Sequence, residues 1–424
     1  MCFLLQKLHK MNIIAQINSL GPVKDSEVEF HPLMVFTGES GLGKSYTAFL
    51  FYYLMMSFNS ERLINIIRKK WPNIDNDFDD KTFSLKFKDL HKWINEGTPS
   101  YMGYLLGNND FECSVNFIFP FEDEKKIEIS IKNQDELIVI SINRKVTSIF
   151  PESIRTSRSI IVSLTLSRYL CMELFHHSTY MPILLPPARA AFMGGNDMSS
   201  SVGMYREFLN KLSLLKAPSP IRKKEDSFFN SMVSKLLGGK LVSTNGEISL
   251  QIPGITPIPI SATASSIKEL SPFMLLLQNG GNVENYSVLF EEPEAHVHPL
   301  KQYTVMDILA RSVNKGMYIQ MTTHSDYMLS RFNQLIRLGD IKKKSENIFN
   351  EYCSKFQHNK NLYIDSDMVG AYFFKRENNN VKIITQDVGQ GIQYDSFSDI
   401  VKKQMNDNAS IDEYGEKVGL YFES

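Results

Sequence analysis

The sequence has few of the features that mark secreted, disulfide-linked or membrane-embedded proteins. Only four of its 424 residues are cysteines, and none of them forms a C-x-x-C pair. This scattered usage argues against a disulfide framework or a structural zinc site and favours a reducing compartment. No apolar run approaches the roughly 18 residues of a membrane helix, and the apolar patch within residues 1–11 is too short for a signal peptide. We therefore expect a cytoplasmic protein that does not enter a membrane.

An excess of charge of one sign is also absent. The formal net charge is −1, and charged residues make up an ordinary 22% of the chain. Such a balance provides no global attraction to nucleic acid or to anionic membranes. Three local basic clusters remain, at residues 68–70, 222–224 and 342–344. Each is either a solvated face or part of a phosphate-contacting stripe on a DNA-facing surface.

One octet, directly after the apolar residues 33–36, is a complete phosphate-binding loop of the G-x-x-x-x-G-K-S type. The apolar run predicts a buried strand, and the residues from Tyr46 onward predict a helix, so that backbone N–H groups and the positive helix end face one anion. Lys44 is expected to reach the outer phosphates of a nucleotide, and the Ser45 hydroxyl to hold Mg²⁺. The expected nucleotide-binding set in this region is Gly38, Glu39, Ser40, Gly41, Leu42, Gly43, Lys44, Ser45 and Tyr46.

A second motif supplies the acidic groups that such a loop requires. Residues 287–290 predict a buried strand, which ends in Glu291 and Glu292. Because the carboxyl ends of parallel strands lie beside the phosphate loop, Glu291 is expected to reach Mg²⁺ directly or through water. Glu292 is expected to orient the attacking water as a general base. The alternative is a surface pair of glutamates that caps the following helix.

A histidine follows the next apolar run. Thr323, His324 and Ser325 come after residues 317–322, so we expect them at the same edge of the sheet. An imidazole at that position can hydrogen-bond a terminal phosphate and report whether it is present. The alternative is a histidine with a structural role only.

The order of apolar runs indicates an α/β fold. Residues 12–19 and 27–36 predict two strands that lead into the phosphate loop, and residues 46–70 predict helix. Residues 82–150 alternate in a way that predicts an antiparallel β layer near the nucleotide. The order helix, strand, helix, strand over residues 265–322 predicts a parallel core. We divide the chain into an ATPase lobe at 1–160, a mostly helical insertion or linker region at 161–260, and a second ATPase lobe with a C-terminal extension at 261–424.

Together these motifs resemble the RecF/SMC-like branch of the ABC ATPases. The residues concerned are 38–45, Glu-Glu-Pro-Glu-Ala-His-Val-His-Pro at 291–299, and Thr-His-Ser at 323–325. The chain is most similar to the compact ATPases related to the OLD (overcoming lysogenization defect) family, over residues 12–56 and 261–340. The resemblance implies a P-loop NTPase with an ABC-type head, in which a mixed or parallel sheet is flanked by helices and accompanied by an antiparallel β layer and a helical insertion.

The resemblance also implies a dimer in which two heads sandwich two ATP molecules. Each phosphate loop then faces a signature segment of the partner, and residues 263–270 look like that segment. Ser265 and Ser266, at a helix start, would meet the γ-phosphate across the interface. Ile267 departs from the family pattern because a glycine is usual there, and Glu291 stands where ABC proteins generally have aspartate. The alternative role for Ser265 is that of a plain helix cap.

Three further groups each have a functional and a structural interpretation. His296 and His298 have a metal-like H-x-H spacing but no evident third ligand, so we assign them to a loop that crosses the dimer interface. The acidic residues at 365 and 367 are interpreted as a solvated turn rather than a nuclease metal site. Arg189, which follows an apolar run, is expected either to contact phosphate or to lock a domain interface.

The function that follows is an ATP-binding and ATP-hydrolysing switch that uses Mg²⁺ and forms a homodimer or a higher even oligomer. By resemblance, its hydrolysis would act on double-stranded DNA or on a separate effector protein, as in phage defence or DNA maintenance. The alternatives are an ATP-dependent OLD-like nuclease and an ATPase subunit that regulates a separate toxin or nuclease without touching DNA. About 100 residues follow His324, which is little for a nuclease domain. A transporter subunit and a small-molecule kinase fit the Glu291, Glu292 and His324 pattern poorly.

Overall fold

The computed structural model covers most of the chain. The residues that it describes are 13–76, 81–154, 156–177, 180–193, 200, 202–216, 227–244, 246–279, 283–393 and 395–417. The basic cluster at 222–224 lies outside them. Among the helices of these ranges, none combines the length and the apolar character that a membrane crossing requires.

A nine-stranded mixed sheet forms the centre of the molecule, in the order β5-β1-β2-β16-β15-β3-β14-β13-β9. Its half from β15 to β9 is parallel, and β1, β2 and β5 pair antiparallel at the other end. The carboxyl ends of β3, β14 and β13 therefore meet at one edge. The strands are β1 Ile14–Leu20, β2 Val23–Glu29, β3 Leu33–Gly38, β5 Cys113–Ile118, β9 Met181–Leu185, β13 Tyr286–Glu291, β14 Tyr318–Thr322, β15 Val369–Glu377 and β16 Asn380–Thr385.

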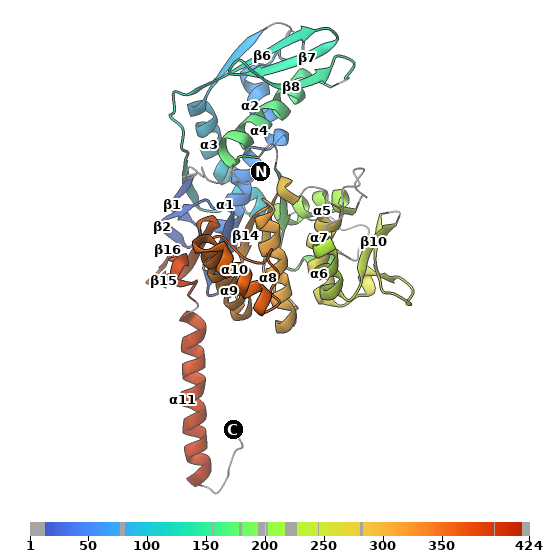
Figure 1. Cartoon of the computed structure of the whole chain (residues 1–424). Helices are drawn as coiled ribbons and strands as arrows, with labels where there is room; N and C mark the ends of the chain where they lie inside the picture. Colours follow the sequence, from blue (N-terminus) through green and yellow to red (C-terminus); the bar gives the residue numbers. More distant parts are fainter. Residues whose placement is uncertain are drawn as a thin grey trace.

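Helices cover both faces of this sheet (Figure 1). The alternation of β3 assigns the faces, because Met34 and Phe36 belong to one apolar cluster with α1, while Leu33 and Val35 belong to a second cluster with α7, α8 and α9. The helices are α1 Lys44–Ser57, α2 Ser60–Lys70, α3 Phe87–Leu106, α4 Arg158–Phe175, α5 Gly203–Lys216, α6 Ser227–Leu237, α7 Ser265–Asn279, α8 Pro299–Asn314, α9 Asp326–Lys344, α10 Glu346–Lys355 and α11 Asp395–Lys417.

Two smaller antiparallel sheets lie outside the main one. The first has the order β4-β6-β7-β8 and sits at the far end of the lobe that contains α2, α3 and α4 (Figure 1). The second has the order β10-β11-β12 and accompanies α6. Their strands are β4 Thr82–Lys86, β6 Lys126–Gln134, β7 Leu137–Ile142, β8 Lys145–Pro151, β10 Lys240–Thr244, β11 Glu247–Gln251 and β12 Ile258–Pro259.

Several sequence-based boundaries are wrong. The strand expected at 27–36 is two strands, β2 and β3, because the chain leaves the sheet at His31 and Pro32. The helix expected at 46–70 is interrupted at Asn59, whose side chain accepts a hydrogen bond from the Glu61 amide and caps α2. The β layer expected at 82–150 contains the 20-residue helix α3. Of its strands, β5 joins the main sheet beside β1, whereas β4, β6, β7 and β8 form a separate sheet at the far end of the lobe (Figure 1). The region at 161–260 also supplies β9 to the main sheet.

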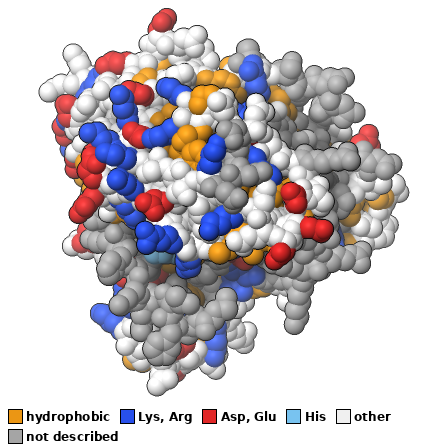
Figure 2. Space-filling view, turned by 90° about the horizontal axis from the view of Figure 1, so that it is seen from above, with side chains coloured by type: hydrophobic (Ala, Val, Ile, Leu, Met, Phe, Trp, Pro, Cys, Tyr) orange, Lys and Arg blue, Asp and Glu red, His pale blue; other side chains and the backbone are white. Residues whose placement is uncertain are grey.

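The basic clusters that the structure describes have local partners. Residues 68–70 form the last turn of α2, where positive charge is favoured by the helix dipole. In that turn, Lys70 pairs with Asp89. Residues 342–344 end α9 in the same way, and Lys343 pairs with Asp367. Seen from above, basic side chains gather toward one side of the molecule with acidic ones among them (Figure 2).

Candidate active site

The phosphate loop lies between β3 and α1, as the motif predicts, and it needs its glycines for two different reasons. Gly38, Gly41 and Gly43 all have positive φ, at 125°, 77° and 92°, where a side chain is strained. A Cβ on Gly38 would also lie 2.5 Å from the Phe374 carbonyl oxygen of β15. Leu42 is buried and anchors the loop in the core. The loop is therefore held in a shape that aims backbone N–H groups inward.

Lys44, the first residue of α1, is the buried cation of the loop. Its ammonium donates hydrogen bonds to the carbonyls of Gly38, at 3.0 Å, and Glu39, at 2.6 Å. Burial lowers the pKa of Lys44 to about 8, although nearby glutamates, with Glu291 foremost, oppose the shift. The side chain remains mainly protonated at neutral pH and supplies one positive charge to the site.

Ser45 and Glu291 meet as the sequence predicts. The Ser45 hydroxyl donates to Glu291 Oε2 at 2.7 Å, and the Thr322 hydroxyl donates to the same oxygen at 3.2 Å. Complete burial raises the pKa of Glu291 to about 7, and the two hydroxyl donors oppose the rise. The other carboxylate oxygen, Oε1, is buried without a hydrogen-bond partner. A serine hydroxyl beside a buried carboxylate oxygen with a free lone pair fits Mg²⁺, which prefers hard oxygen ligands.

Glu292 lies at the rim of the cavity in an unusual backbone conformation. Its φ is +42°, which is strained for a residue with a side chain. Its amide donates to both the carbonyl oxygen and the hydroxyl of Thr322, each at 3.2 Å. The peptide that carries the expected general base is thus fixed to β14.

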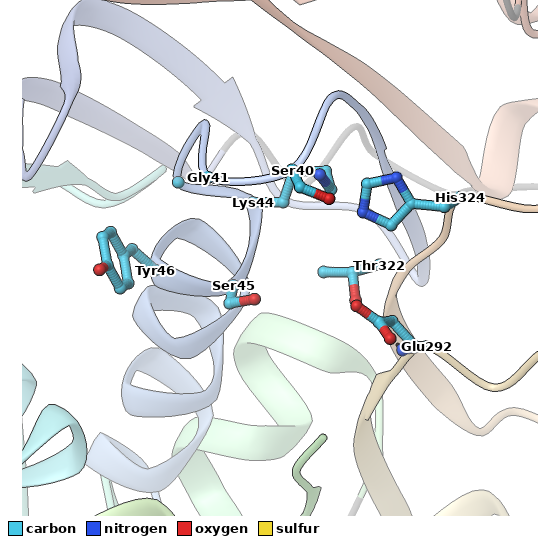
Figure 3. A pocket seen from close by; sticks show the side chains of 9 residues that line it. Ser40, Gly41, Lys44, Ser45, Tyr46, Glu292, Thr322 and His324 are labelled. Atoms are coloured by element: carbon cyan, nitrogen blue, oxygen red, sulfur yellow. Dashed lines mark hydrogen bonds between the residues drawn. The ribbon is translucent and has the colours of Figure 1, made fainter. Parts of the chain in front are cut away.

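A cavity of about 210 Å³ joins these groups. Figure 3 shows the Ser45 hydroxyl facing Thr322, with His324 on the side of Ser40 and Lys44, while the Tyr46 ring turns away. Tyr46 packs edge-to-face on Phe111, with ring centroids 4.9 Å apart. The cavity is lined by Ser40, Gly41, Gly43, Lys44, Ser45, Tyr46, Glu292, Thr322 and His324.

Other predicted residues lie outside that lining. Gly38 and Leu42 determine the shape of the loop without lining the cavity, and Glu291 accepts the hydrogen bond of Ser45 without lining it. Glu39 is exposed and borders a separate cavity of about 620 Å³ beside β15 and β16. Ser265 and Ser266, at the start of α7, do not line the phosphate cavity of their own chain, and Ser265 is exposed.

His324 is placed by Glu294, a residue that the sequence analysis did not select. Glu294 Oε1 accepts hydrogen bonds from the Thr323 hydroxyl at 2.8 Å and from the His324 amide at 2.6 Å. Burial raises the pKa of Glu294. Burial, helped by the charge of Lys44, lowers the pKa of His324 and so favours its neutral imidazole. The third acid of the Glu-Glu-Pro-Glu run was the signal that could have identified this role.

Arg189 locks elements together and does not line the phosphate cavity. It opens the short 3₁₀ helix Arg189–Phe192 after β9 and is fully buried. Its guanidinium donates to the carbonyls of Glu269 on α7 and of Glu291 on β13, each at 2.7 Å. Of the two expected roles, the structure therefore supports the locking one.

Two of the remaining candidates make local contacts within the chain. His298 caps α8 by accepting from the Leu300 amide. Asp365 caps a 3₁₀ turn, and Lys343 pairs with both Asp365 and Asp367. In the described part of the chain, no three His, Cys, Asp or Glu side chains are grouped so as to hold a metal ion.

No family model matches the chain, and no curated protein matches it. Its structure is similar to SMC head domains. The SMC head bound to the C-winged helix domain of ScpA is 13% identical, with a TM-score of 0.40 over 90% of this chain and 98% of that one. A ScpA-bound head with an extended coiled coil, derived from Pyrococcus furiosus, is 11% identical, with a TM-score of 0.37 over 93% and 99%. The SMC head from Thermotoga maritima is 12% identical, with a TM-score of 0.35 over 89% and 100%.

These similarities are weak. The predicted fold class is nevertheless confirmed by the topology of this chain, which is an α/β P-loop fold with a mixed sheet flanked by helices and antiparallel β layers. The chemistry proposed for the site therefore rests on the geometry of this chain alone.

Proposed function

We propose that this protein is an ATP-binding and ATP-hydrolysing switch that dimerises around ATP. One observation carries the proposal: the phosphate loop and the strained Glu292 line one cavity, and the Ser45 hydroxyl in that lining donates a hydrogen bond of 2.7 Å to the buried Glu291 carboxylate. A loop alone would bind any phosphate. A loop with a metal-type carboxylate and a second carboxylate at the cavity rim is suited to cleaving a phosphoanhydride.

In this proposal, Lys44 and the loop amides bind the β- and γ-phosphates. Ser45 and Glu291 would hold Mg²⁺, which would neutralise developing charge on the phosphate oxygens. Glu292 accepts a proton from water as the water oxygen bonds to the γ-phosphorus and the bond to the β–γ bridging oxygen breaks. ADP and inorganic phosphate leave, and Glu292 returns its proton to solvent or phosphate. The neutral His324 donates or accepts one hydrogen bond at the γ-phosphate.

We propose the dimer because the cavity is small and apolar side chains are exposed near it in the sequence. Its 210 Å³ is below the roughly 300–1,000 Å³ of complete ligand pockets. Two apolar side chains are exposed close in sequence to the catalytic loops: Leu300, at 80%, opens α8 after the Glu292 loop, and Tyr327, at 54%, follows His324. Ser265 is exposed at a helix start and does not line the phosphate cavity of its own chain. A second protomer would cover the apolar pair and bring its Ser265 to the open side.

Turnover of ATP by the purified protein, alone and with double-stranded DNA, tests this function, with Glu292→Gln as the control. We propose that hydrolysis acts on a separate effector protein or on double-stranded DNA, in phage defence or DNA maintenance. Turnover that rises with DNA would select DNA, and turnover that is indifferent to DNA would select a protein partner. Absence of Mg²⁺-dependent turnover under both conditions would reject the ATPase proposal.

A further inference from the structure

Arg189 contacts two segments that have different roles in the proposed reaction. One is the helix that carries the signature serine, and the other is the strand that leads to the expected general base. Its Nε donates to the Glu269 carbonyl and lies 3.3 Å from the Glu269 carboxylate. Its Nη1 donates to the carbonyls of Pro186, at 3.1 Å, and Glu291, at 2.7 Å, and its Nη2 donates to the Glu292 carbonyl at 3.4 Å. The guanidinium also lies over the Phe290 ring, 4.6 Å from its centroid. A planar group with donors in a fixed fork therefore joins α7 to the end of β13.

The α7 end of this connection lies one helical turn from the signature serine. Glu269 follows Ser265 by four residues, so the two lie on the same side of the helix. Pro272 interrupts the hydrogen bonding of this turn, because it has no N–H for the carbonyl four residues earlier. Ile267 is partly buried and packs against the apolar cluster that includes Leu270. The start of α7 is thus a short, anchored piece of helix attached to Arg189.

The β13 end of the connection is the strained peptide of Glu292. Its amide is fixed by Thr322 and its carbonyl by Arg189. A φ of +42° persists only where the surroundings hold it in place. A shift of Arg189 would therefore move the carboxylate that is expected to orient water.

We propose that Arg189 is a positioning residue that couples the two nucleotide sites of the dimer. The inference rests on the proposed function, because it needs Ser265 to face the partner's nucleotide. Glu292 serves the nucleotide of its own chain. A contact made by Ser265 on one nucleotide would then be transmitted through Glu269 and Arg189 to the base that acts on the other.

The first test is Arg189→Lys, which keeps the positive charge but loses the planar fork. We expect the turnover number to fall about 100-fold, as for a catalytic group displaced by about 1 Å, and the Hill coefficient for ATP to fall to 1. ATP binding should stay within twofold of wild type. The matched control is Arg331→Lys, which alters an ion pair of 2.8 Å to Asp307 between α8 and α9. Wild-type turnover and cooperativity in Arg189→Lys would overturn the proposal.

The second test leaves Arg189 intact, so it remains valid if Arg189→Lys folds poorly. Mixed dimers carry Ser265→Ala in one protomer only, and their assembly in ATP is confirmed by light scattering. If the sites are independent, one site stays intact and half of the wild-type turnover remains, which would overturn the coupling. We expect less than a tenth of wild-type turnover. A wild-type protein without turnover or ATP-dependent dimers would instead reject the proposed function itself.

Discussion

The phosphate loop and the signature segment are built in opposite ways. Lys44 is buried and held by two carbonyls, and the glycines beside it allow the positive φ angles that the loop requires. Ser265, by contrast, is exposed at a helix start and does not line the phosphate cavity of its own chain. The comparison teaches that, in the proposed dimer, one protomer preorganises the half of the site that binds phosphate and offers the other half to its partner. Binding and turnover should therefore separate under mutation.

The largest expected effect is on the preorganised half. Lys44→Ala removes a charged donor worth about 1.5–3 kcal/mol per hydrogen bond, so we expect ATP affinity to fall about 100-fold or more and turnover to vanish with it. Titration calorimetry with ATP and Mg²⁺ measures this, with the exposed Lys240→Ala as the control. Unchanged affinity in Lys44→Ala would remove the basis for the phosphate loop.

Glu292→Gln should separate binding from chemistry within the same half. The amide cannot accept the proton of water, so we expect turnover to fall about 10²–10⁴-fold while ATP affinity is retained. The variant should accumulate as an ATP-bound dimer in light scattering. A Glu292→Gln protein that stays monomeric in saturating ATP would contradict the sandwich.

Ser265→Arg tests the half that is offered to the neighbour. The bulky cation should block the second protomer, so hydrolysis is lost while ATP affinity measured on the monomer changes by less than about twofold. Ser213→Arg, on the exposed surface of α5, is the matched control. Loss of ATP binding in Ser265→Arg would mean that the serine serves its own nucleotide.

The smallest effect is a pH-dependent change in stability. Because burial raises the pKa of Glu291 from 4.5 to about 7, the folded protein binds a proton in this range that the unfolded chain does not. The contribution of this group to stability is thus complete below pH 4.5 and is lost as the pH rises through 7.

Glu291→Gln removes the loss of stability that accompanies ionisation of this carboxyl group at high pH. We expect it to raise the free energy of unfolding of the nucleotide-free protein by on the order of 1–3 kcal/mol at pH 8, with the gain shrinking toward pH 5. Urea unfolding at the two pH values measures it, with the exposed Glu247→Gln as the control. Equal gains at both pH values would show that packing, not ionisation, is responsible.

The two halves of the site also differ in how much of their structure could be predicted from the sequence. The loop residues 38–45 are contiguous, and together with the apolar run before them and the residues after them they predicted the strand, the turn and the helix that the structure has. The pairing of Ser45 with Glu291 followed from the rule that parallel strands end at one edge. The break at Asn59 and the whole of α3 were missed, because an apolar pattern that continues across a cap, or alternates within a helix, does not reveal where the backbone changes course.

Glu294 and Arg189 show most clearly what could not be predicted from the sequence. Glu294 was visible as a third acid, yet its hydrogen bonds to Thr323 and His324 exist only because β13 and β14 are neighbours. Arg189 was singled out with two roles left open. The role that it has depends on the pairing of β9 with β13, because this pairing brings Arg189 to the Glu291 carbonyl about a hundred positions later in the chain.

The sequence by itself determined the position and shape of the phosphate loop, because glycine dihedrals, one lysine and one serine act within eight consecutive residues. Only the tertiary structure decided that Glu291 is buried with one unpaired oxygen, that Glu292 is strained, and that Arg189 ties both to α7. The physical reason is that burial, strain and hydrogen-bond partners are properties of neighbours in space, and sheet order chooses those neighbours.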